Sequence, residues 1–284
     1  SRYPDVYVEW GVELGGRYYS SDITEIEIKD GLIENGSSKN QGGNLYLAEG
    51  ATFNLYGGTI NGGYATKGGA IYMMNKASNV ENTDCDFVGN KVTDGSSEGG
   101  AAMYINIGTA KLTNVTMTGN ENKGNHGTAI TYGGNSVVTL DDCTITGNNN
   151  TSTSNAKKAG IALVNSNAKM TVKGKTVIDN NMNGLNNANP VECNLYLRTD
   201  GSKLTVGALE DGASIRITTG DHTVENDPNV FMNYGDNTPV ITAKNNDWLI
   251  YENREAAGEK ACIIGYNETD RFYFGTLSIH KHAA

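Results

Sequence analysis

Two short motifs repeat along this chain with a shared period, and this repetition limits the fold more than any other feature of the sequence. The first motif is an apolar residue followed, three positions later, by Asn. Copies begin at Phe87, Met117 and Ile145, with looser copies at Val177, Ile60 and Leu32. Successive copies start roughly 30 residues apart, a period typical of proteins that stack one supersecondary unit per repeat.

The second motif, in phase with the first, consists of small residues followed by an apolar-Tyr-apolar strand. It occupies residues 42–47, 68–73 and 99–105, with degenerate copies at 127–130, 160–163 and 194–197. A third segment alternates apolar and polar residues, in the pairs Phe53 and Leu55, Val138 and Leu140, and Met170 and Val172. Each period therefore holds three short strands with the two-residue periodicity of β-structure, and helical periodicity is absent.

Three strands per repeat without helices predict an all-β fold, a right-handed parallel β-helix. Each coil buries its apolar face only by stacking on its neighbours, about 4.8 Å away. We expect residues 1–29 to form an N-terminal cap or strands, and residues 30–200 to form the regular coils. Residues 201–284, where the period fades, should form irregular final coils or a small capping β-subdomain.

The apolar residues that lead the motifs should face the interior in two columns. One contains Leu45, Ile71, Met103, Ile130, Leu163 and Leu195, and the other contains Phe87, Met117, Ile145 and Val177. Cys85 and Cys143 should also face inward, two coils apart, which is too far for a disulfide. With Cys193 and Cys262 they are expected to be buried free thiols.

Gly and Asn recur at the corners of the predicted coil. The Gly pairs allow sharp turns where a side chain would clash. The corner asparagines are Asn90, Asn120, Asn148 and Asn180. We expect these asparagines to adopt a left-handed conformation and to stack into a hydrogen-bonded ladder.

The tyrosines of the second motif are the first candidates for a ligand site. Tyr46, Tyr72 and Tyr104 alternate with inward residues, so they should form an outward column that Thr131 and Val164 interrupt before Tyr196. Exposed stacked rings could bind sugars or a partner protein. The alternative is that the rings brace one another or lie under loops, because aromatic pairs between strands stabilise sheets.

Acidic residues at another corner are the second candidates. Asp84, Asn114 and Asp142 should form one outward column, with Asp86 beside it. Paired carboxylates could act as acid and base or hold calcium. The alternative is a set of solvated strand charges, since one coil separates Asp84 from Asp142. No other metal or cofactor is expected.

Insertions gather at the corner that follows the Asn motif, in residues 91–98, 121–126, 149–158 and 181–192. In repeat proteins such insertions often mark the binding face, and the alternative is tolerated surface variation. The formal charge is −10, from 22 Lys and Arg against 32 Asp and Glu. The sequence contains no basic stripe of the kind that binds nucleic acid. No apolar run reaches the roughly 20 residues of a membrane span, and no signal peptide is visible.

The Gly-Gly-Ala-Ile and Phe-x-x-Asn motifs resemble the repeats of polymorphic outer-membrane proteins and related β-helical surface proteins, over roughly residues 30 to 220. The versions Ile/Met-Thr-Gly-Asn and Gly-Gly-Ala-Ile-Tyr look most like surface proteins of Gram-positive gut bacteria. The resemblance implies export and a surface or adhesive role. It transfers no catalytic residue, because these motifs are architectural.

Pectin-type lyases and polygalacturonase-type hydrolases share the predicted architecture, so catalysis must be weighed. The regular coils lack the Arg of the lyases, since none occurs between Arg17 and Arg198, and the Arg-x-Lys of the hydrolases is absent. Only His126 falls in the coils. We therefore expect an extracellular, surface-displayed, non-catalytic adhesin that binds a host or microbial glycan or a surface protein. The alternatives are a pectin-lyase-like polysaccharide lyase or glycoside hydrolase, and a passive structural stalk.

Overall fold

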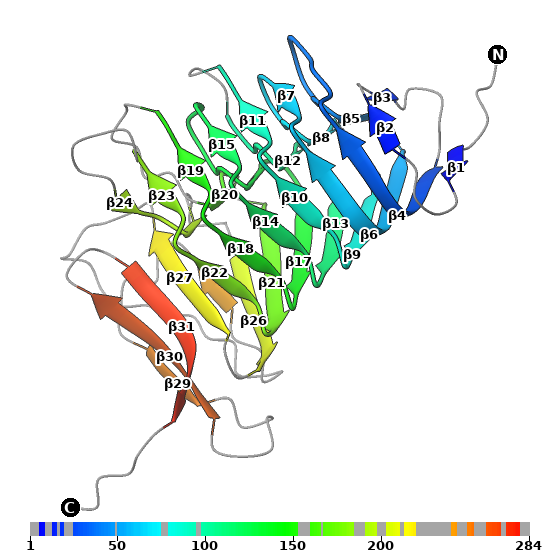
Figure 1. Cartoon of the computed structure of the whole chain (residues 1–284). Coiled ribbons are helices and arrows are strands. Elements are labelled where there is room, and N and C mark those ends of the chain that lie inside the picture. Colours follow the sequence, from blue (N-terminus) through cyan, green and yellow to red (C-terminus); the bar gives the residue numbers. More distant parts are fainter. Residues whose placement is uncertain are drawn as a thin grey trace, which may run out of the picture.

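The chain folds into a parallel β-helix, seen in a computed structural model (Figure 1). The structure describes residues 6–8, 13–15, 18–19, 25–48, 50–74, 79–94, 98–152, 160–165, 167–184, 191–197, 203–210, 213–219, 240–242, 249–252, 260–267 and 271–278. These residues form strands and no helix, as the repeats predict.

Each regular coil contributes one strand to each of three parallel sheets. The first-position strands are β4 (Glu25–Glu34), β6 (Thr52–Asn61), β9 (Asn79–Thr83), β13 (Thr109–Thr113), β17 (Val137–Asp141), β21 (Lys169–Gly174) and β26 (Lys203–Leu209). The second-position strands are the later halves of β4 and β6, then β10 (Asp86–Val88), β14 (Thr116–Thr118), β18 (Thr144–Thr146), β22 (Val177–Asp179) and β27 (Ser214–Thr219). The third-position strands are β5 (Leu45–Leu47), β8 (Ile71–Met73), β12 (Met103–Ile105), β16 (Ile130–Tyr132), β20 (Ile161–Leu163) and β25 (Leu195–Leu197).

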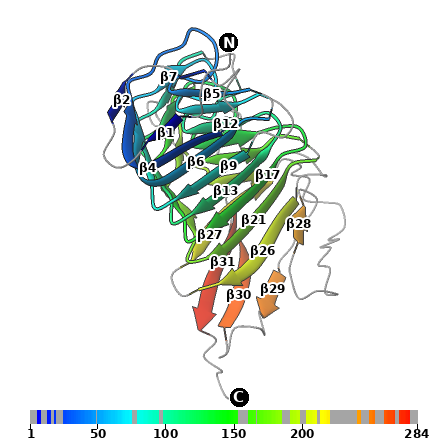
Figure 2. The same cartoon turned by 90° about the vertical axis from the view of Figure 1, so that its right-hand side faces the viewer.

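A fourth, narrow sheet lies between the second and third positions, and the sequence motifs do not predict it. Its two-residue strands are β7 (Tyr64–Ala65), β11 (Lys91–Val92), β15 (Glu121–Asn122), β19 (Asn149–Asn150) and β23 (Met182–Asn183), with β24 (Val191–Glu192) antiparallel at its end. Figure 2 shows the coils stacked one on another from the N-terminal to the C-terminal end.

The interior is filled by the predicted apolar columns, with two corrections. In the third-position column, Ile161 rather than Leu163 pairs with Ile130 and Leu195. Both Ile161 and Leu163 are fully buried, because residues two apart on a strand face the same side, so the alternating pattern alone could not choose between them. Leu163 instead continues the column that contains Tyr132.

The second correction concerns the column of Phe87, Met117 and Ile145, which Ile178 continues in place of Val177. Val177 pairs with Thr144 and is only half-buried. The reason is one additional corner residue, Lys175, which moves the strand by one position relative to the motif.

The predicted free thiols are present at Cys85, Cys143 and Cys193, all of them buried. Burial raises the pKa of the Cys85 thiol, and it raises the pKa of Cys143 to about 11. Cys143 Sγ also lies 3.3 Å from the backbone carbonyl oxygen of Leu112. The Cys262 side chain lies outside the described part of the chain.

An asparagine ladder runs up the corner after the second-position strands. Each rung repeats one pattern: Asn120 donates from Nδ2 to Oδ1 of Asn148 at 2.8 Å, and Asn90 donates in the same way to Asn120 at 3.0 Å. All three are fully buried. Asn181, not Asn180, is the next member, accepting from Asn148 at 2.8 Å.

The left-handed conformation expected of these asparagines belongs to the residue before each of them. Gly89, Gly119 and Gly147 have φ of 64°, 63° and 67°. Asn180 occupies the equivalent position with φ 53°, and it is exposed. Glycine takes this position because it adopts positive φ without steric cost, which leaves the asparagine free to point inward and bond.

The ends of the chain use different pairings. Strands β1 (Val6–Val8), β2 (Glu13–Gly15) and β3 (Tyr18–Tyr19) pair in parallel with β4, β4 and β5, so that coil-like pairing begins before residue 30. Strands β28 (Val240–Thr242), β29 (Leu249–Glu252), β30 (Lys260–Asn267) and β31 (Arg271–Ser278) are antiparallel to their partners. In the described residues, no helix is long and apolar enough to cross a membrane.

Candidate functional site

The tyrosine column exists, but its rings are buried. Tyr46, Tyr72 and Tyr104 stack in register, with ring centroids 5.4 Å and 5.2 Å apart, and are only 6%, 5% and 3% exposed. Thr131 and Ala162, rather than Val164, continue the column to Tyr196. The expectation of exposed ring faces is therefore wrong for these three tyrosines, and the mutual-bracing alternative describes their geometry.

Charged side chains contact the Tyr104 end of this aromatic stack. Glu98 accepts a hydrogen bond from the Tyr104 hydroxyl and forms an ion pair with Lys67, with Nζ and Oε2 3.2 Å apart. The Lys67 ammonium also lies 5.3 Å from the centroid of the Tyr104 ring, a cation–π distance. The side chains of Lys67 and Glu98 are 29% and 45% exposed. Both groups therefore reach solvent from a fixed position on the stack.

The electrostatics of this cluster follow from its contacts. Burial raises the pKa of Tyr104, and its hydrogen bond to Glu98 raises it further; burial likewise raises the pKa of Tyr72 to about 12. Burial alone would raise the pKa of Glu98, but the Tyr104 hydroxyl, Lys67 and the nearby His126 together lower it. Glu98 is therefore held as a carboxylate.

Lys67, Glu98 and His126 come from the same connection in three successive coils. Each lies between a strand of the narrow sheet and the following third-position strand. We call this region the loop corner. The insertions expected at this corner, residues 91–98 and 121–126, contain Glu98 and His126, but Lys67 and the contact between Lys67 and Glu98 were not predicted, although each of the three residues lies directly before the Gly of the second motif.

Two asparagines of the narrow sheet fix the start of the loops at this corner. Asn122 Oδ1 accepts from the backbone N–H of Gly124 at 2.6 Å, and Asn150 Oδ1 accepts from that of Ser152 at 2.9 Å. The Asn122 and Asn150 side chains also donate to the His126 carbonyl oxygen, at 2.7 Å and 3.2 Å. Both asparagines are fully buried. The loops therefore start from a rigid base.

The acidic candidates lie at the corner between the first- and second-position strands. Asp84, Asn114 and Asp142 follow one another in successive coils, all exposed and with positive φ. Asp84 accepts from the Asn114 side chain at 2.6 Å, and Asp142 accepts from the Lys175 backbone N–H at 2.6 Å. Asp86 pairs with Thr116. The carboxylates of Asp84 and Asp142 thus accept hydrogen bonds within the corner, and Asn114 lies between these two aspartates in the column.

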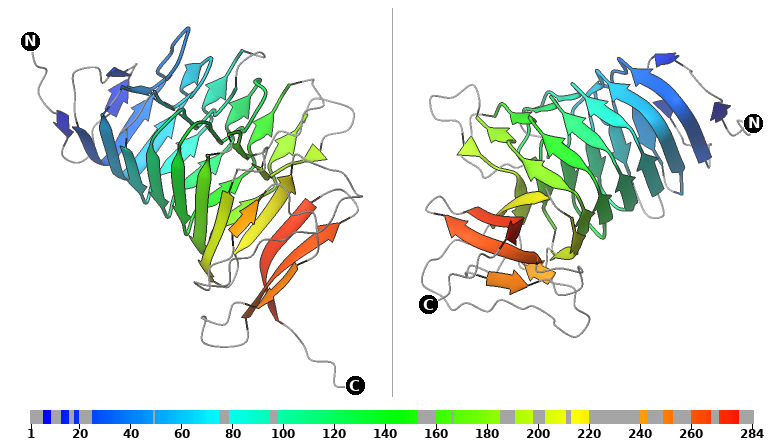
Figure 3. Two further views of the ribbon diagram at one scale, coloured as in Figure 1. Left: turned by 180° about the vertical axis from the view of Figure 1, so that it is seen from behind. Right: turned by 60° about the horizontal axis from the view of Figure 1, so that its bottom comes forward.

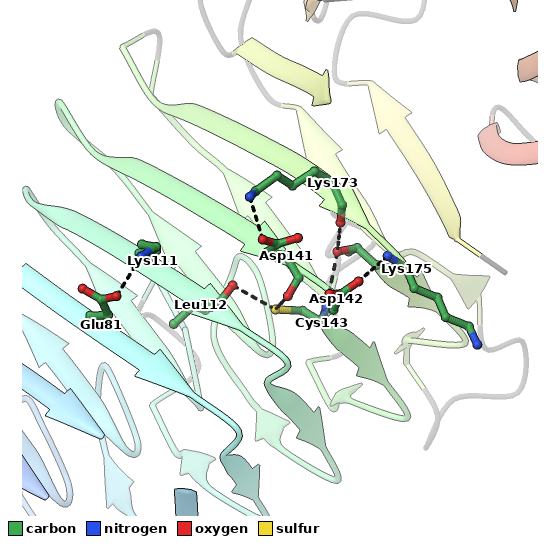
Figure 4. A network of polar contacts seen from close by, with 9 residues as sticks. Glu81, Lys111, Leu112, Asp141, Asp142, Cys143, Lys173 and Lys175 are labelled. Atoms are coloured by element: carbon green, nitrogen blue, oxygen red, sulfur yellow. Dashed lines mark hydrogen bonds and ion pairs between the residues drawn. The ribbon is translucent and has the colours of Figure 1, made fainter. Parts of the chain in front are cut away.

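Ion pairs also cross the broad first-position sheet, as Figure 4 shows. Glu81 and Lys111 are 2.7 Å apart, and Asp141 and Lys173 are 2.6 Å apart. Within the described part of the chain, no group of three or more His, Cys, Asp or Glu side chains is placed to hold a metal ion. Comparisons of the chain with family models, with curated proteins and with solved structures find no match.

Proposed function

We propose that this chain is a non-catalytic recognition module, displayed outside the cell, that binds a glycan or a surface protein through the loop corner. The observation that carries the proposal is the partly exposed Lys67–Glu98 ion pair fixed on the buried tyrosine stack. Charged groups that are already held in place lose little conformational entropy when a ligand binds. The anchored starts of the neighbouring loops extend the same preorganisation.

The extracellular part of the proposal is supported by the repeat motifs, and the cysteines do not oppose it. Buried thiols with raised pKa values resist oxidation, so Cys85 and Cys143 are compatible with an oxidising environment. The resemblance to polymorphic outer-membrane proteins and to bacterial β-helical surface proteins belongs to the same proposal. The tyrosines contribute indirectly, as the base that positions Lys67 and Glu98.

Binding to a glycan array and to a panel of cell-surface proteins tests the proposal. Lys67→Met and Glu98→Gln should each weaken a wild-type interaction by about tenfold, the effect of losing one well-placed polar contact. The matched control is Lys111→Met, which removes an ion pair from the broad sheet and should leave binding unchanged.

Two results would replace the proposal by one of its rivals. A chain that binds nothing in either panel would be a passive stalk. Release of unsaturated or reducing ends from an acidic polysaccharide, abolished by Asp84→Asn or Asp142→Asn, would make the chain a pectin-lyase-like lyase or a hydrolase.

A further inference from the structure

The last coil, formed by β26 and β27, differs from the others because antiparallel strands, rather than a further coil, pair with its downstream side. The first-position strand β26 pairs in parallel with β21 and antiparallel with β28, through Leu204 and Ile241. The second-position strand β27 pairs in parallel with β22 and antiparallel with β31, through Ile215 and Phe274. The later half of β27 is the third-position strand of this coil: it pairs in parallel with β25 of the preceding coil and, at Ile217, antiparallel with β31. Figure 3 shows these strands gathered at the C-terminal end of the coil.

The covering strands reduce the length of open edge. Without them, β26 and β27 would offer seven and six residues of parallel strand edge. With them, β28 covers residues 203–205 of β26 and β31 covers residues 214–217 of β27, and the outermost strands are β28 and β29, of three and four residues. A strand edge is a template for pairing with another chain, and natural proteins protect such edges with short or covering strands.

The N-terminal coil offers the complementary surface. Strands β1 and β2 pair with β4, and β3 pairs with β5, at the same strand positions as in the later coils. In the described residues, these three strands have a partner on one side only. The parallel edge of β26 and β27 in one molecule therefore matches the N-terminal coil of a second molecule in strand direction and spacing.

We propose that β28 and β31 form an edge cap that blocks head-to-tail association with a second copy of this chain. Without the cap, the edge of β26 and β27 in one molecule would pair with the N-terminal coil of the next molecule. Because this contact joins two different surfaces, it does not close on itself and extends into filaments. This inference does not depend on the ligand of the loop corner. It concerns the opposite ends of the coil, and its test measures mass rather than ligand binding.

Proline substitutions in the full chain test the cap, because proline fixes φ near −65° and removes a backbone donor. The double variant Ile241→Pro, Phe274→Pro disrupts the pairing of both covering strands. The matched control is Ile250→Pro, which disrupts β29 and β30 but touches neither β26 nor β27. Light scattering after size-exclusion chromatography measures the mass of each protein.

The double variant should show at least a twofold higher mass that grows with concentration, while wild type and Ile250→Pro remain at the monomer mass. Hydrogen exchange at β12 and β16 verifies that the coils stay folded in every variant. Adding Tyr7→Pro in β1 should restore the monomer mass. A folded double variant that stays monomeric would overturn the proposal, as would association that persists with Tyr7→Pro.

Discussion

Asn120 donates from its side-chain Nδ2 to Oδ1 of Asn148 at 2.8 Å, so the corners of two successive coils are joined by side chains as well as by the backbone. Asn120 also donates to the Phe87 carbonyl oxygen and accepts from the Asn90 backbone N–H, both at 3.0 Å. A single amide thus satisfies groups in the coils on either side of it.

Asn120→Ala should lower the free energy of unfolding by about 2–3 kcal/mol, because it leaves buried polar groups of neighbouring coils without a partner. Urea denaturation followed by circular dichroism measures the loss. Asn114→Ala is the control: Asn114 is exposed, so its loss should stay at about 1 kcal/mol, which comes from placing alanine at a φ of 50°. Equal losses in the two variants would show that the ladder does not stabilise the coil.

Asn82 presents the opposite case, a buried asparagine whose side-chain Nδ2 and Oδ1 both lack a hydrogen-bond partner among the described residues. It occupies an apolar column between Leu55 and Leu112. Asn82→Leu should therefore raise the free energy of unfolding by about 1–3 kcal/mol, because it removes two unsatisfied groups and adds apolar burial. Asn82→Asp, which buries a charge in the same place, should lower it. A destabilised leucine variant would contradict this interpretation.

The narrow corner beside the ladder depends on glycine at position 63. A Cβ there would lie 2.2 Å from the Gly69 carbonyl oxygen and 2.7 Å from Asn44 Nδ2. Gly63→Ala should cost about 3 kcal/mol or more in unfolding free energy, because the Gly69 backbone of the same coil must move. In the described part of the chain, no atom lies within 4 Å of a Cβ at position 89, so Gly89→Ala is opposed only by its φ of +64° and should cost about 1 kcal/mol. Thermal unfolding should rank the two accordingly.

The periodicity of the sequence was sufficient to predict the coil, its three strand positions and most of its inward columns. The motif was placed one residue early, at Val177 and Asn180, because Ile178 and Asn181 fit the same spacing and the additional corner residue Lys175 shifts the strand to that second pair. The alternating pattern cannot distinguish two residues that lie two positions apart on a strand, because both face the same side. Leu163 was therefore expected in the column that Ile161 occupies.

The candidate site was harder to predict than the fold. Alternation correctly placed Tyr72 and Tyr104 on the outer side of their strands, but it cannot say what covers them. The contacts on Tyr104 come from Glu98 and Lys67, which belong to connections without periodicity. Distances between such residues are set by how successive coils stack, and a single sequence carries no direct signal of that contact.

The buried thiols should be chemically inert in the folded chain. A Cys262→Ser variant limits the measurement to Cys85, Cys143 and Cys193, all buried. Because the thiolate is the reactive species and burial raises the pKa of Cys143 to about 11, a disulfide reagent at pH 8 should react only after denaturant is added. Reaction of a full equivalent within minutes under native conditions would show that at least one of these thiols is accessible.

The Glu98 cluster should make stability depend on pH on the acidic side. Because the pKa of Glu98 is lowered in the folded chain, its contribution is present above the unfolded value near 4.5 and is lost as the pH falls through the folded value. The stability difference between wild type and Glu98→Gln should therefore be constant above about pH 5.5 and shrink below pH 4. It should stay under about 1 kcal/mol, since solvent screens a half-exposed carboxylate.

Tyr104→Phe separates the hydrogen bond from the ion pair in this cluster. The substitution keeps the ring stack but removes the hydroxyl that donates to Glu98. The loss of stability between pH 5.5 and pH 3 should therefore become smaller. It should not disappear, because Lys67 remains 3.2 Å from the Glu98 carboxylate. Urea denaturation at a series of pH values between 3 and 7 measures all three proteins. If the wild-type and Glu98→Gln curves ran parallel across that range, Glu98 would have the same pKa in the folded and unfolded chain, and the cluster would not hold it as a carboxylate.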